Sequence, residues 1–131
     1  MNRQLKFRVW DKLAERMIYP HNDNQQHFII DLNGRFHNLQ NGSGGDDYVI
    51  QQYTGLTDNN DDPIYEGDIL KNHYDVGNNI IGQVLYESDH GGYIFQWKRK
   101  GRGQDYKNLN CDVAFESVIV GNKFEHSELL N

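Results

Sequence analysis

The sequence predicts a mainly β protein with little helix. Three observations lead to this fold class: apolar and polar residues alternate over short stretches, aromatic residues are scattered through the chain, and Gly, Asn and Asp clusters separate the stretches. The 131 residues include 8 Tyr and 6 Phe, which favour strands. A chain of this length is expected to form a single domain, residues 1–131. We therefore expect about eight or nine short strands.

The first twenty residues are predicted to form two paired strands. Between residues 5 and 10, apolar side chains alternate with Lys6 and Arg8. This period of two is typical of a half-buried strand. A polar turn begins at Asp11, and residues 17–19 form the return strand.

A second strand pair is predicted around an Asn-Gly turn. Its strands cover residues 28–32 and 35–39, and Asn33 and Gly34 join them. Both residue types tolerate the positive φ angles of a type I′ turn, which matches the twist of paired strands. Residues 41–47 follow as a flexible loop, because glycine and short polar side chains bury nothing.

Short strands and turns continue through the middle of the chain. Strands are expected at residues 48–54, 63–65 and 69–71, where strand-forming residues cluster. An acidic turn at 58–62 and a tight turn at 66–68 separate them.

The clearest packing signal lies in the second half of the chain. A strand at residues 80–87 contains Gly82, which indicates a close backbone approach of the kind found in small barrels. Three aromatic residues alternate along the next strand and therefore share one of its faces: Tyr93, Phe95 and Trp97. Residues 98–108 are predicted to form a loop.

The last part of the chain is predicted to add two more strands. Apolar residues alternate between 109 and 115, which predicts a strand with Cys111 on its buried face. Residues 117–120 form the next strand, 121–122 a turn, and 127–130 a single helical turn.

Composition limits the classes of function. The net charge of −6 argues against a nucleic-acid binder that ignores sequence, because such proteins neutralise phosphates with excess Lys and Arg. No apolar run is long enough to span a bilayer or to form a signal peptide, so we expect a cytoplasmic protein with no membrane partner. The single cysteine forms no internal disulfide and supplies no cysteine cluster for a metal.

One acidic stretch partly matches a calcium-binding loop. Asp58, Asn60 and Asp62 occupy its first, third and fifth positions. The match then fails, because Pro63 and Ile69 stand where the loop requires Gly and Glu. A solvated acidic turn is the better interpretation.

Other catalytic and metal-binding signals are weak. The six histidines have no pair at zinc-ligand spacing, and Ser43 lies outside the strand-turn-helix context of a nucleophile. We therefore expect no metal, no cofactor and no enzymatic activity. One enzymatic alternative stays open, a site built from scattered carboxylates: Asp58, Asp61, Asp62, Glu66 and Asp68.

A basic and aromatic stretch is the candidate for nucleic-acid binding. Cations bind phosphate and aromatic rings stack on bases, and seven residues combine these properties: Trp97, Lys98, Arg99, Lys100, Arg102, Tyr106 and Lys107. Lys6 and Arg8 are candidates to extend the patch. The alternative interpretation is a solvated hairpin tip whose charge protects a sheet edge.

Three blocks of sequence, in order, resemble the YopX family of phage and prophage proteins. The first block covers residues 5–11 with 17–19. The second and most specific is Gln-Tyr-Thr-Gly-Leu at 52–56 with Ile-Tyr-Glu-Gly-Asp-Ile at 64–69. The third covers 118–122 and the closing 128–130. The chain departs from the family pattern at residues 59–62 and 123–127, where the turn chemistry differs.

The resemblance implies a fold and a biological setting. It implies a phage or prophage origin, a small partly open (SH3-like) barrel with additional N-terminal hairpins, and a homo-oligomer. It implies no established activity and no catalytic residue, so the motif residues are interpreted as structural: Gln52, Tyr53, Thr54, Gly55, Tyr65, Glu66, Gly67, Asp68, Gly121 and Asn122.

The leading expectation is a non-enzymatic β module that assembles with itself or docks onto another phage or host protein. Short strands leave unpaired backbone groups at sheet edges, and an interface satisfies them. The alternatives are an accessory protein that binds nucleic acid through residues 97–107 and an enzyme with an unrecognised carboxylate site.

Overall fold

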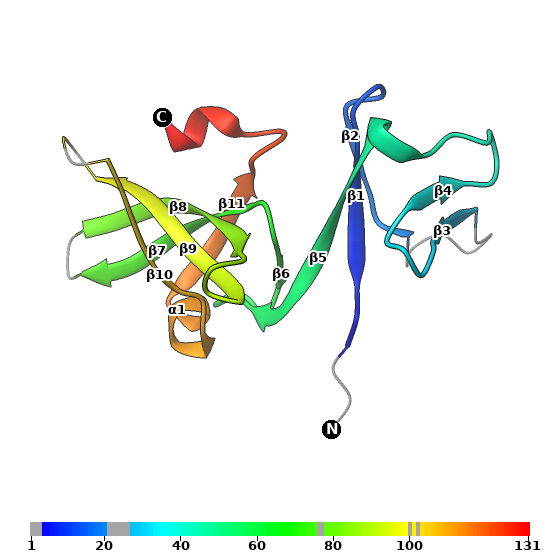
Figure 1. Cartoon of the computed structure of the whole chain (residues 1–131). Coiled ribbons are helices and arrows are strands. Elements are labelled where there is room, and N and C mark those ends of the chain that lie inside the picture. Colours follow the sequence, from blue (N-terminus) through cyan, green and yellow to red (C-terminus); the bar gives the residue numbers. More distant parts are fainter. Residues whose placement is uncertain (1–3, 21–26, 76–77, 100, 102) are drawn as a thin grey trace. The chain divides into compact units, whose positions relative to one another are not determined.

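The computed structural model describes residues 4–20, 27–75, 78–99, 101 and 103–131. The protein is mainly β, as predicted (Figure 1). Its contacts group the chain into two compact units, Met1–Tyr53 and Thr54–Asn131. The boundary falls inside one strand, β5 (Tyr48–Thr57), and outside the glycine-rich loop.

The N-terminal unit is built from hairpins. Strand β1 (Phe7–Asp11) pairs antiparallel with β2 (Arg16–Ile18) on one side and with β5 on the other. A separate two-stranded sheet consists of β3 (Phe28–Ile30) and β4 (Phe36–Asn38) (Figure 1). Both predicted strand pairs are therefore present.

A small apolar core holds this unit together. Val9, Ile18 and Phe36 are buried. Four partly buried side chains pack against them: Phe28, Ile30, Tyr48 and Ile50. The ring centroids of Phe36 and Tyr48 lie 4.6 Å apart, so an aromatic contact joins β4 to β5.

The turn between β3 and β4 differs from the predicted type I′ geometry. Gly34 has a φ of +78°, whereas the described non-glycine residues with positive φ are Glu15 and Asp61. Asn33 is therefore not left-handed, and the predicted turn type is wrong. The physical reason is Asp31, whose Oδ1 accepts the backbone amides of Asn33 (2.9 Å) and Arg35 (3.0 Å) and stabilises a longer turn.

The loop at residues 41–47 follows a defined path. Gly44 forms a β-bridge with His37, and a 3₁₀ helix covers Gly45–Asp47. The Ser43 hydroxyl lies 2.6 Å from the Tyr48 hydroxyl. The predicted flexibility of this loop stays a prediction.

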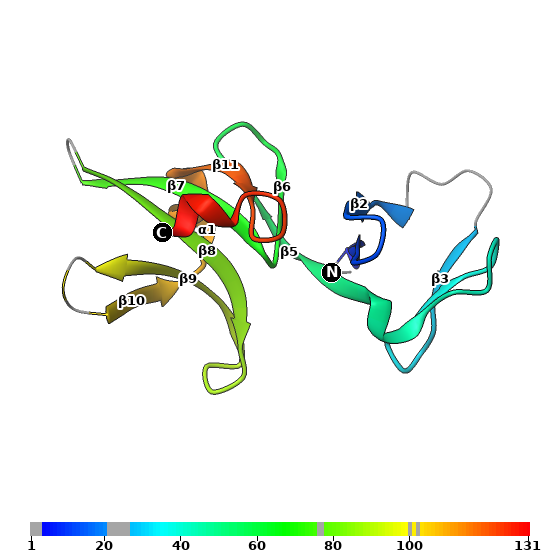
Figure 2. The ribbon, with the colours of Figure 1, turned by 90° about the horizontal axis from the view of Figure 1, so that it is seen from above.

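The C-terminal unit contains a curled antiparallel sheet. The end of β5 pairs with β6 (Pro63–Tyr65), and five strands form the sheet in the order β10-β9-β8-β7-β11. The remaining bounds are β7 (Asp68–Asp75), β8 (Asn78–Glu87), β9 (Gly92–Arg99), β10 (Gly103–Asn108) and β11 (Ser117–Asn122). Strand β8 curves along its length in both ribbon views (Figures 1 and 2). The curl agrees with the predicted partly open barrel and is compatible with its SH3-like detail.

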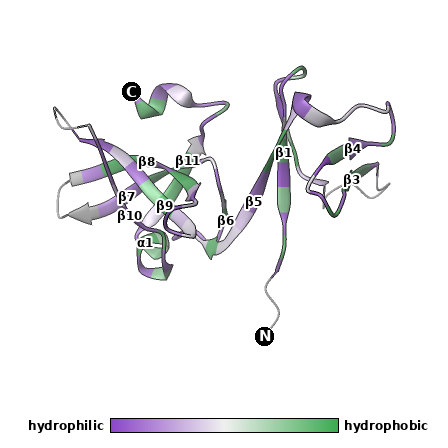
Figure 3. Ribbon diagram, in the orientation of Figure 1, coloured by the Kyte–Doolittle hydropathy of each residue, from purple (hydrophilic) through white to green (hydrophobic). Residues whose placement is uncertain are grey.

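The core of this unit lies on one face of the sheet. Its buried members are Ile64, Leu70, Val84, Phe95, Val113 and Ala114. Tyr93 and Trp97 pack against this core, so the three alternating aromatics share a face as predicted. Figure 3 shows the alternation of hydrophobic and hydrophilic residues along these strands.

Gly82 marks the predicted close approach of two strands. A Cβ at this position would meet the backbone carbonyl oxygen of Gln96 and would lie 2.9 Å from the Phe95 ring. Any larger residue would therefore push β8 away from β9.

Two predicted elements of the C-terminal half are wrong. Residues 98–108 are not one loop, because β9 continues to Arg99 and β10 covers Gly103–Asn108. Residues 109–116 are not a strand, because Cys111–Phe115 form helix α1. Asn110 Oδ1 accepts the Val113 amide at 2.9 Å and caps this helix.

The helix reverses the expected burial of Cys111, whose side chain is exposed. Val113 and Ala114 are the buried residues of the helix. The prediction that Cys111 lies on a buried face is therefore wrong.

The end of the chain follows the prediction more closely. The predicted turn at 121–122 lies within β11, which has an irregularity between Ile119 and Gly121. A 3₁₀ helix covers Ser127–Leu130, where a single helical turn was predicted. In the described part of the chain, no helix is long and apolar enough to cross a membrane.

Candidate functional site

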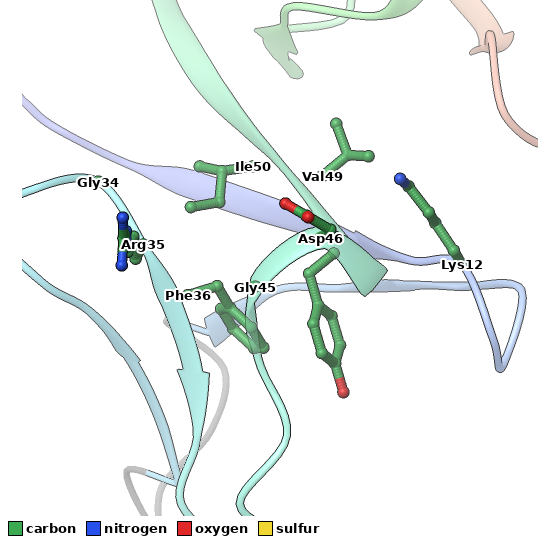
Figure 4. A pocket seen from close by; sticks show the side chains of 9 residues that line it. Lys12, Gly34, Arg35, Phe36, Gly45, Asp46, Val49 and Ile50 are labelled. Atoms are coloured by element: carbon green, nitrogen blue, oxygen red, sulfur yellow. The ribbon is translucent and has the colours of Figure 1, made fainter.

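A groove in the N-terminal unit is the candidate site. Its volume is about 700 Å³, which is within the usual range of about 300–1,000 Å³ for ligand pockets. The residues that line it come from β4, β5 and the segments around them (Figure 4): Lys12, Gly34, Arg35, Phe36, Gly45, Asp46, Tyr48, Val49 and Ile50.

The groove combines an apolar floor with charged side chains. Phe36 is buried, while Tyr48 and Ile50 are half-buried and pack against the same core. Lys12 and Arg35 are exposed and lie on opposite sides of Ile50 in Figure 4. Such a surface suits a ligand with apolar side chains and negative charge.

The groove reaches the edge of β5. Successive residues of a strand point to opposite faces of the sheet. Because both Val49 and Ile50 line the groove, it extends around the strand edge and is not confined to one face. At the start of this strand the Tyr48 amide donates to the carbonyl of Gly45, which also lines the groove.

Exposed leucines lie at the turns of the same unit. Leu13 is 78% exposed between β1 and β2, and Leu32 is fully exposed between β3 and β4. Leu39, just after β4, is 59% exposed. Turn tips are normally polar, so these leucines are exposed apolar side chains at positions where polar ones are usual.

The structure divides the predicted basic and aromatic patch between two faces. In the register of β9 and β10, Trp97 lies opposite Asp105, and Phe95 lies opposite Lys107. Cross-strand partners share a face, so Trp97, Arg99 and Lys107 lie on the core side of the hairpin. Lys98 and Tyr106 lie on the other side. Lys100 and Arg102 are outside the described residues.

Several members of that patch already have partners inside the protein. Arg99 Nη1 lies 3.4 Å from Asp105 Oδ2, and the Trp97 ring packs on Phe95 at 5.4 Å between centroids. Burial lowers the pKa of Lys107, and the charge of Glu116 opposes this shift. The geometry therefore gives the nucleic-acid alternative little support, and that alternative stays a prediction.

The expected extension of the patch is also limited. Arg8 is 3% exposed and its Nε donates to Gln51 Oε1 at 2.8 Å, so its inclusion is wrong. The Lys6 ammonium lies 5.2 Å from the centre of the Tyr53 ring, a cation–π contact.

The acidic residues around the second family block stabilise turns. Asp58 is 4% exposed and accepts the backbone amides of Asn60, Asp62 and Ile119, each at 2.9 Å. Asp68 Oδ2 accepts the Tyr65 amide at 2.8 Å. Among the residues that the structure describes, no group of three or more His, Cys, Asp or Glu side chains is placed to hold a metal ion.

Of the remaining motif residues, Thr54 and Gly55 lie within β5, Gly67 lies in the turn between β6 and β7, and Asn122 ends β11. Thr54 Oγ1 donates to the Ile64 carbonyl at 2.8 Å, and Gly55 and Gly67 both have φ of +88°. Asn122 Oδ1 accepts the amides of Phe124 and Glu125. These contacts favour the structural interpretation of the motifs.

The groove residues were not found by sequence reasoning. Lys12, Arg35 and Asp46 are separated along the chain, and only the fold brings them to one groove. Leu13 was a usable signal, because it stands in the turn predicted to begin at Asp11, where polar residues are expected. Leu32 was predicted to lie in the strand at residues 28–32, so its exposure was not expected.

Comparisons with known proteins identify a family and a similar fold. The family model described as YopX protein matches residues 6–131. The crystal structure of protein EF1440 from Enterococcus faecalis is similar, with a TM-score of 0.57 and 24% sequence identity. The match covers 99% of this chain and 100% of that one. No curated protein matches the sequence.

Proposed function

Since the chain belongs to the YopX family, we propose that it is a non-enzymatic β module of phage or prophage origin that assembles with itself or docks onto another protein. The observation that carries the proposal is the set of exposed leucines at the turns of the N-terminal unit. Leu13 and Leu32 are mostly or fully exposed to water. Burial of one leucine side chain contributes roughly 2 kcal/mol, so an interface there is favourable.

The small size of the N-terminal core supports the same conclusion. Its fully buried apolar residues are few, and its strands β2, β3 and β4 have three residues each. Short hairpins with a small core are marginally stable alone and gain stability from a partner.

Light scattering coupled to gel filtration tests self-assembly. At tens of micromolar protein, we expect a mass well above the 15.3 kDa of one chain. The double substitution Leu13→Ser and Leu32→Ser is expected to lower that mass, because it removes the exposed apolar contacts. Phe115→Ser is the matched control, since Phe115 is also exposed but lies in the C-terminal unit.

The result separates two forms of the proposal. A monomer at this concentration contradicts self-assembly and leaves docking onto another protein as the remaining form. A mass that responds to Phe115→Ser and not to the leucine substitutions contradicts the assignment of the interface to the N-terminal unit.

A further inference from the structure

We propose that strand β10 is an interface at which a second copy of this chain pairs with it, edge to edge and antiparallel, around a two-fold axis at Tyr106. This inference rests on the proposed self-assembly and names both the partner and the surface. Two observations support it. Strand β10 has unpaired backbone groups at the end of its sheet, and its sequence complements itself in one register.

The outer edge of β10 is defined by its pairing with β9. Strand β10 stands at the end of the order β10-β9-β8-β7-β11, so in the described part of the chain β9 is its one neighbour (Figure 2). The Leu109 amide donates to the Tyr93 carbonyl at 3.0 Å. Such pairs recur at every second residue, so the odd-numbered residues of β10 face β9. The amides and carbonyls of Gln104, Tyr106 and Asn108 therefore point to the outer edge.

Apart from one amide, these outward groups have no partner among the described residues. The exception is the Tyr106 amide, which donates to Asp105 Oδ1 at 3.1 Å in a contact exposed to water. Pairing with a second strand exchanges this contact for a backbone carbonyl and gives the other groups their partners. A row of unpaired amides and carbonyls is a template for another strand.

The outward groups restrict how two copies of β10 pair. Hydrogen-bonded pairs between the copies must join even-numbered residues to even-numbered ones. A two-fold axis at Tyr106 meets this condition, because it pairs Tyr106 with Tyr106 of the second copy and Gln104 with Asn108 of the second copy. In each such pair the two residues exchange both of their backbone hydrogen bonds.

Charge selects this register over its neighbours. With the axis at Tyr106, Asp105 lies opposite Lys107 of the second copy, and Lys107 lies opposite Asp105. An axis at Asp105 places two aspartates opposite each other, and an axis at Lys107 places two lysines opposite each other. Like charges directly opposite are destabilising, whereas opposite charges stabilise the pair. The sequence of β10 therefore favours one symmetric pairing.

The present contacts of these side chains are compatible with the pairing. Asp105 Oδ2 lies 3.4 Å from Arg99 Nη1, and the charge of Glu116 acts on Lys107. A carboxylate accepts several hydrogen bonds and an ammonium donates three, so each group has capacity for a second contact. The Tyr106 side chain is 47% exposed. It adds an aromatic contact across the axis on the other face of the sheet.

Disulfide cross-linking tests the position of the axis. The background variant is Cys111→Ser, because the native thiol is exposed. Addition of Tyr106→Cys places two thiols opposite each other, on Cα atoms about 5.5 Å apart in a hydrogen-bonded pair. This separation suits a disulfide. We expect mild oxidation with diamide to give a covalent dimer on a gel without reductant.

Two further variants in the same background test the register. Gln104→Cys and Asn108→Cys lie opposite each other only between copies, so a mixture of the two variants is expected to form a covalent dimer. Each variant alone is the matched control. In that case the two thiols are four residues apart along the strands, about 14 Å, which is too far for a disulfide.

A backbone substitution tests the pairing without oxidation. Tyr106→Pro removes the outward amide of Tyr106, and proline is tolerated on an edge strand when its nitrogen faces outward. Tyr106→Thr is the matched control, because it also removes the ring but keeps the amide. Light scattering coupled to gel filtration is expected to show a lower mass for the proline variant than for the threonine variant. Circular dichroism and thermal unfolding verify that both variants fold.

The outcomes distinguish this inference from the interface assigned to the exposed leucines. No cross-link in Tyr106→Cys, or equal cross-linking of the single variants and their mixture, overturns the inference. If the mass still falls in the Leu13→Ser and Leu32→Ser variant, the proposed function stands without β10. A mass that falls with Tyr106→Pro and not with the leucine substitutions supports pairing through β10 and contradicts the leucine interface. A monomer that forms no cross-link contradicts self-assembly and this inference together.

Discussion

Asp31 organises the turn between β3 and β4 and has a shifted pKa. Its Oδ2 lies 2.9 Å from His37 Nε2, and this hydrogen bond is the largest cause that lowers the pKa of Asp31 below its ordinary value of 3.8. The backbone amides of Arg35 and Asn33 act in the same direction.

The substitution His37→Ala is expected to raise the pKa of Asp31 toward 3.8. A lowered pKa in the folded state means that this contact stabilises the protein above the unfolded pKa, and that its contribution is lost as pH falls through the folded value. Carboxyl chemical shifts followed by NMR against pH measure the change. His90→Ala, in the other unit, is the control and should leave the Asp31 titration as it is. An unchanged titration in His37→Ala contradicts the assigned cause.

Sequence patterns predicted the close strand approach at Gly82 but not the turn type at residues 33–34. The close approach at Gly82 was predictable because glycine inside a strand has few other uses. The type I′ turn was wrong because the Asp31 side chain competes for the amides of Asn33 and Arg35. That competition depends on the conformation of the Asp31 side chain. The Asn-Gly pair alone does not determine this conformation.

At the scale of elements, Asp58 connects the turn between β5 and β6 to β11. Its Oδ1 accepts two amides within the turn, and its Oδ2 accepts the Ile119 amide of β11. One buried carboxylate therefore joins segments that are far apart in sequence.

Asp58→Ala is expected to destabilise the protein by about 3 kcal/mol, because it leaves backbone amides without a charged acceptor. Asp62→Ala is the control, since the Asp62 side chain is exposed and surface substitutions usually change stability by less than about 0.5 kcal/mol. Urea unfolding followed by tryptophan fluorescence measures both changes. Equal stability of the two variants would show that the turn holds β11 by other contacts.

Helix α1, which was predicted to be a strand, shows why short apolar patterns are ambiguous. The alternating pattern placed Cys111, Val113 and Phe115 on one buried face. In the helix, Val113 is buried together with its neighbour Ala114, whereas Cys111 and Phe115 are exposed. Asn110 was the available signal, because Asn is a favoured N-cap and its side chain binds the Val113 amide. Strand β10 was missed for the opposite reason, since residues 103–108 have no apolar alternation.

The candidate site was less predictable than the elements. Residues 97–107 are neighbours in sequence, yet the strands place Trp97 and Lys98 on opposite faces. The groove depends on contacts between distant segments, such as Phe36 with Tyr48. Local patterns predicted many of the strands, but they contain no information on which separated side chains meet.

At the scale of the whole molecule, the described residues form an apolar core in each of the two units. Val9 is fully buried in the core of the N-terminal unit, and Val84 is fully buried in that of the C-terminal unit. Strand β5 belongs to both units and runs through their boundary without a break. Thermal unfolding can therefore show whether the two units unfold together or separately.

If the chain unfolds as one domain, as its length predicts, Val9→Ala and Val84→Ala each lower the midpoint of the same thermal transition. Each substitution is expected to cost about 2 kcal/mol through lost burial and a residual cavity. Differential scanning calorimetry measures the transitions, and Val120→Ala at a more exposed position is the control. Two transitions that respond to different substitutions would contradict the one-domain prediction.

The pairing of β1 with β5 also constrains the order of events during synthesis. Arg8 and Gln51, which share a buried hydrogen bond across this pair, are 43 residues apart in sequence. The sheet that contains β1 is therefore incomplete until β5 has left the ribosome, whereas β7 to β10 pair with the strands next to them in the chain. Until then the edge of β1 that pairs with β5 has no strand beside it, and an unpaired strand edge is prone to aggregation.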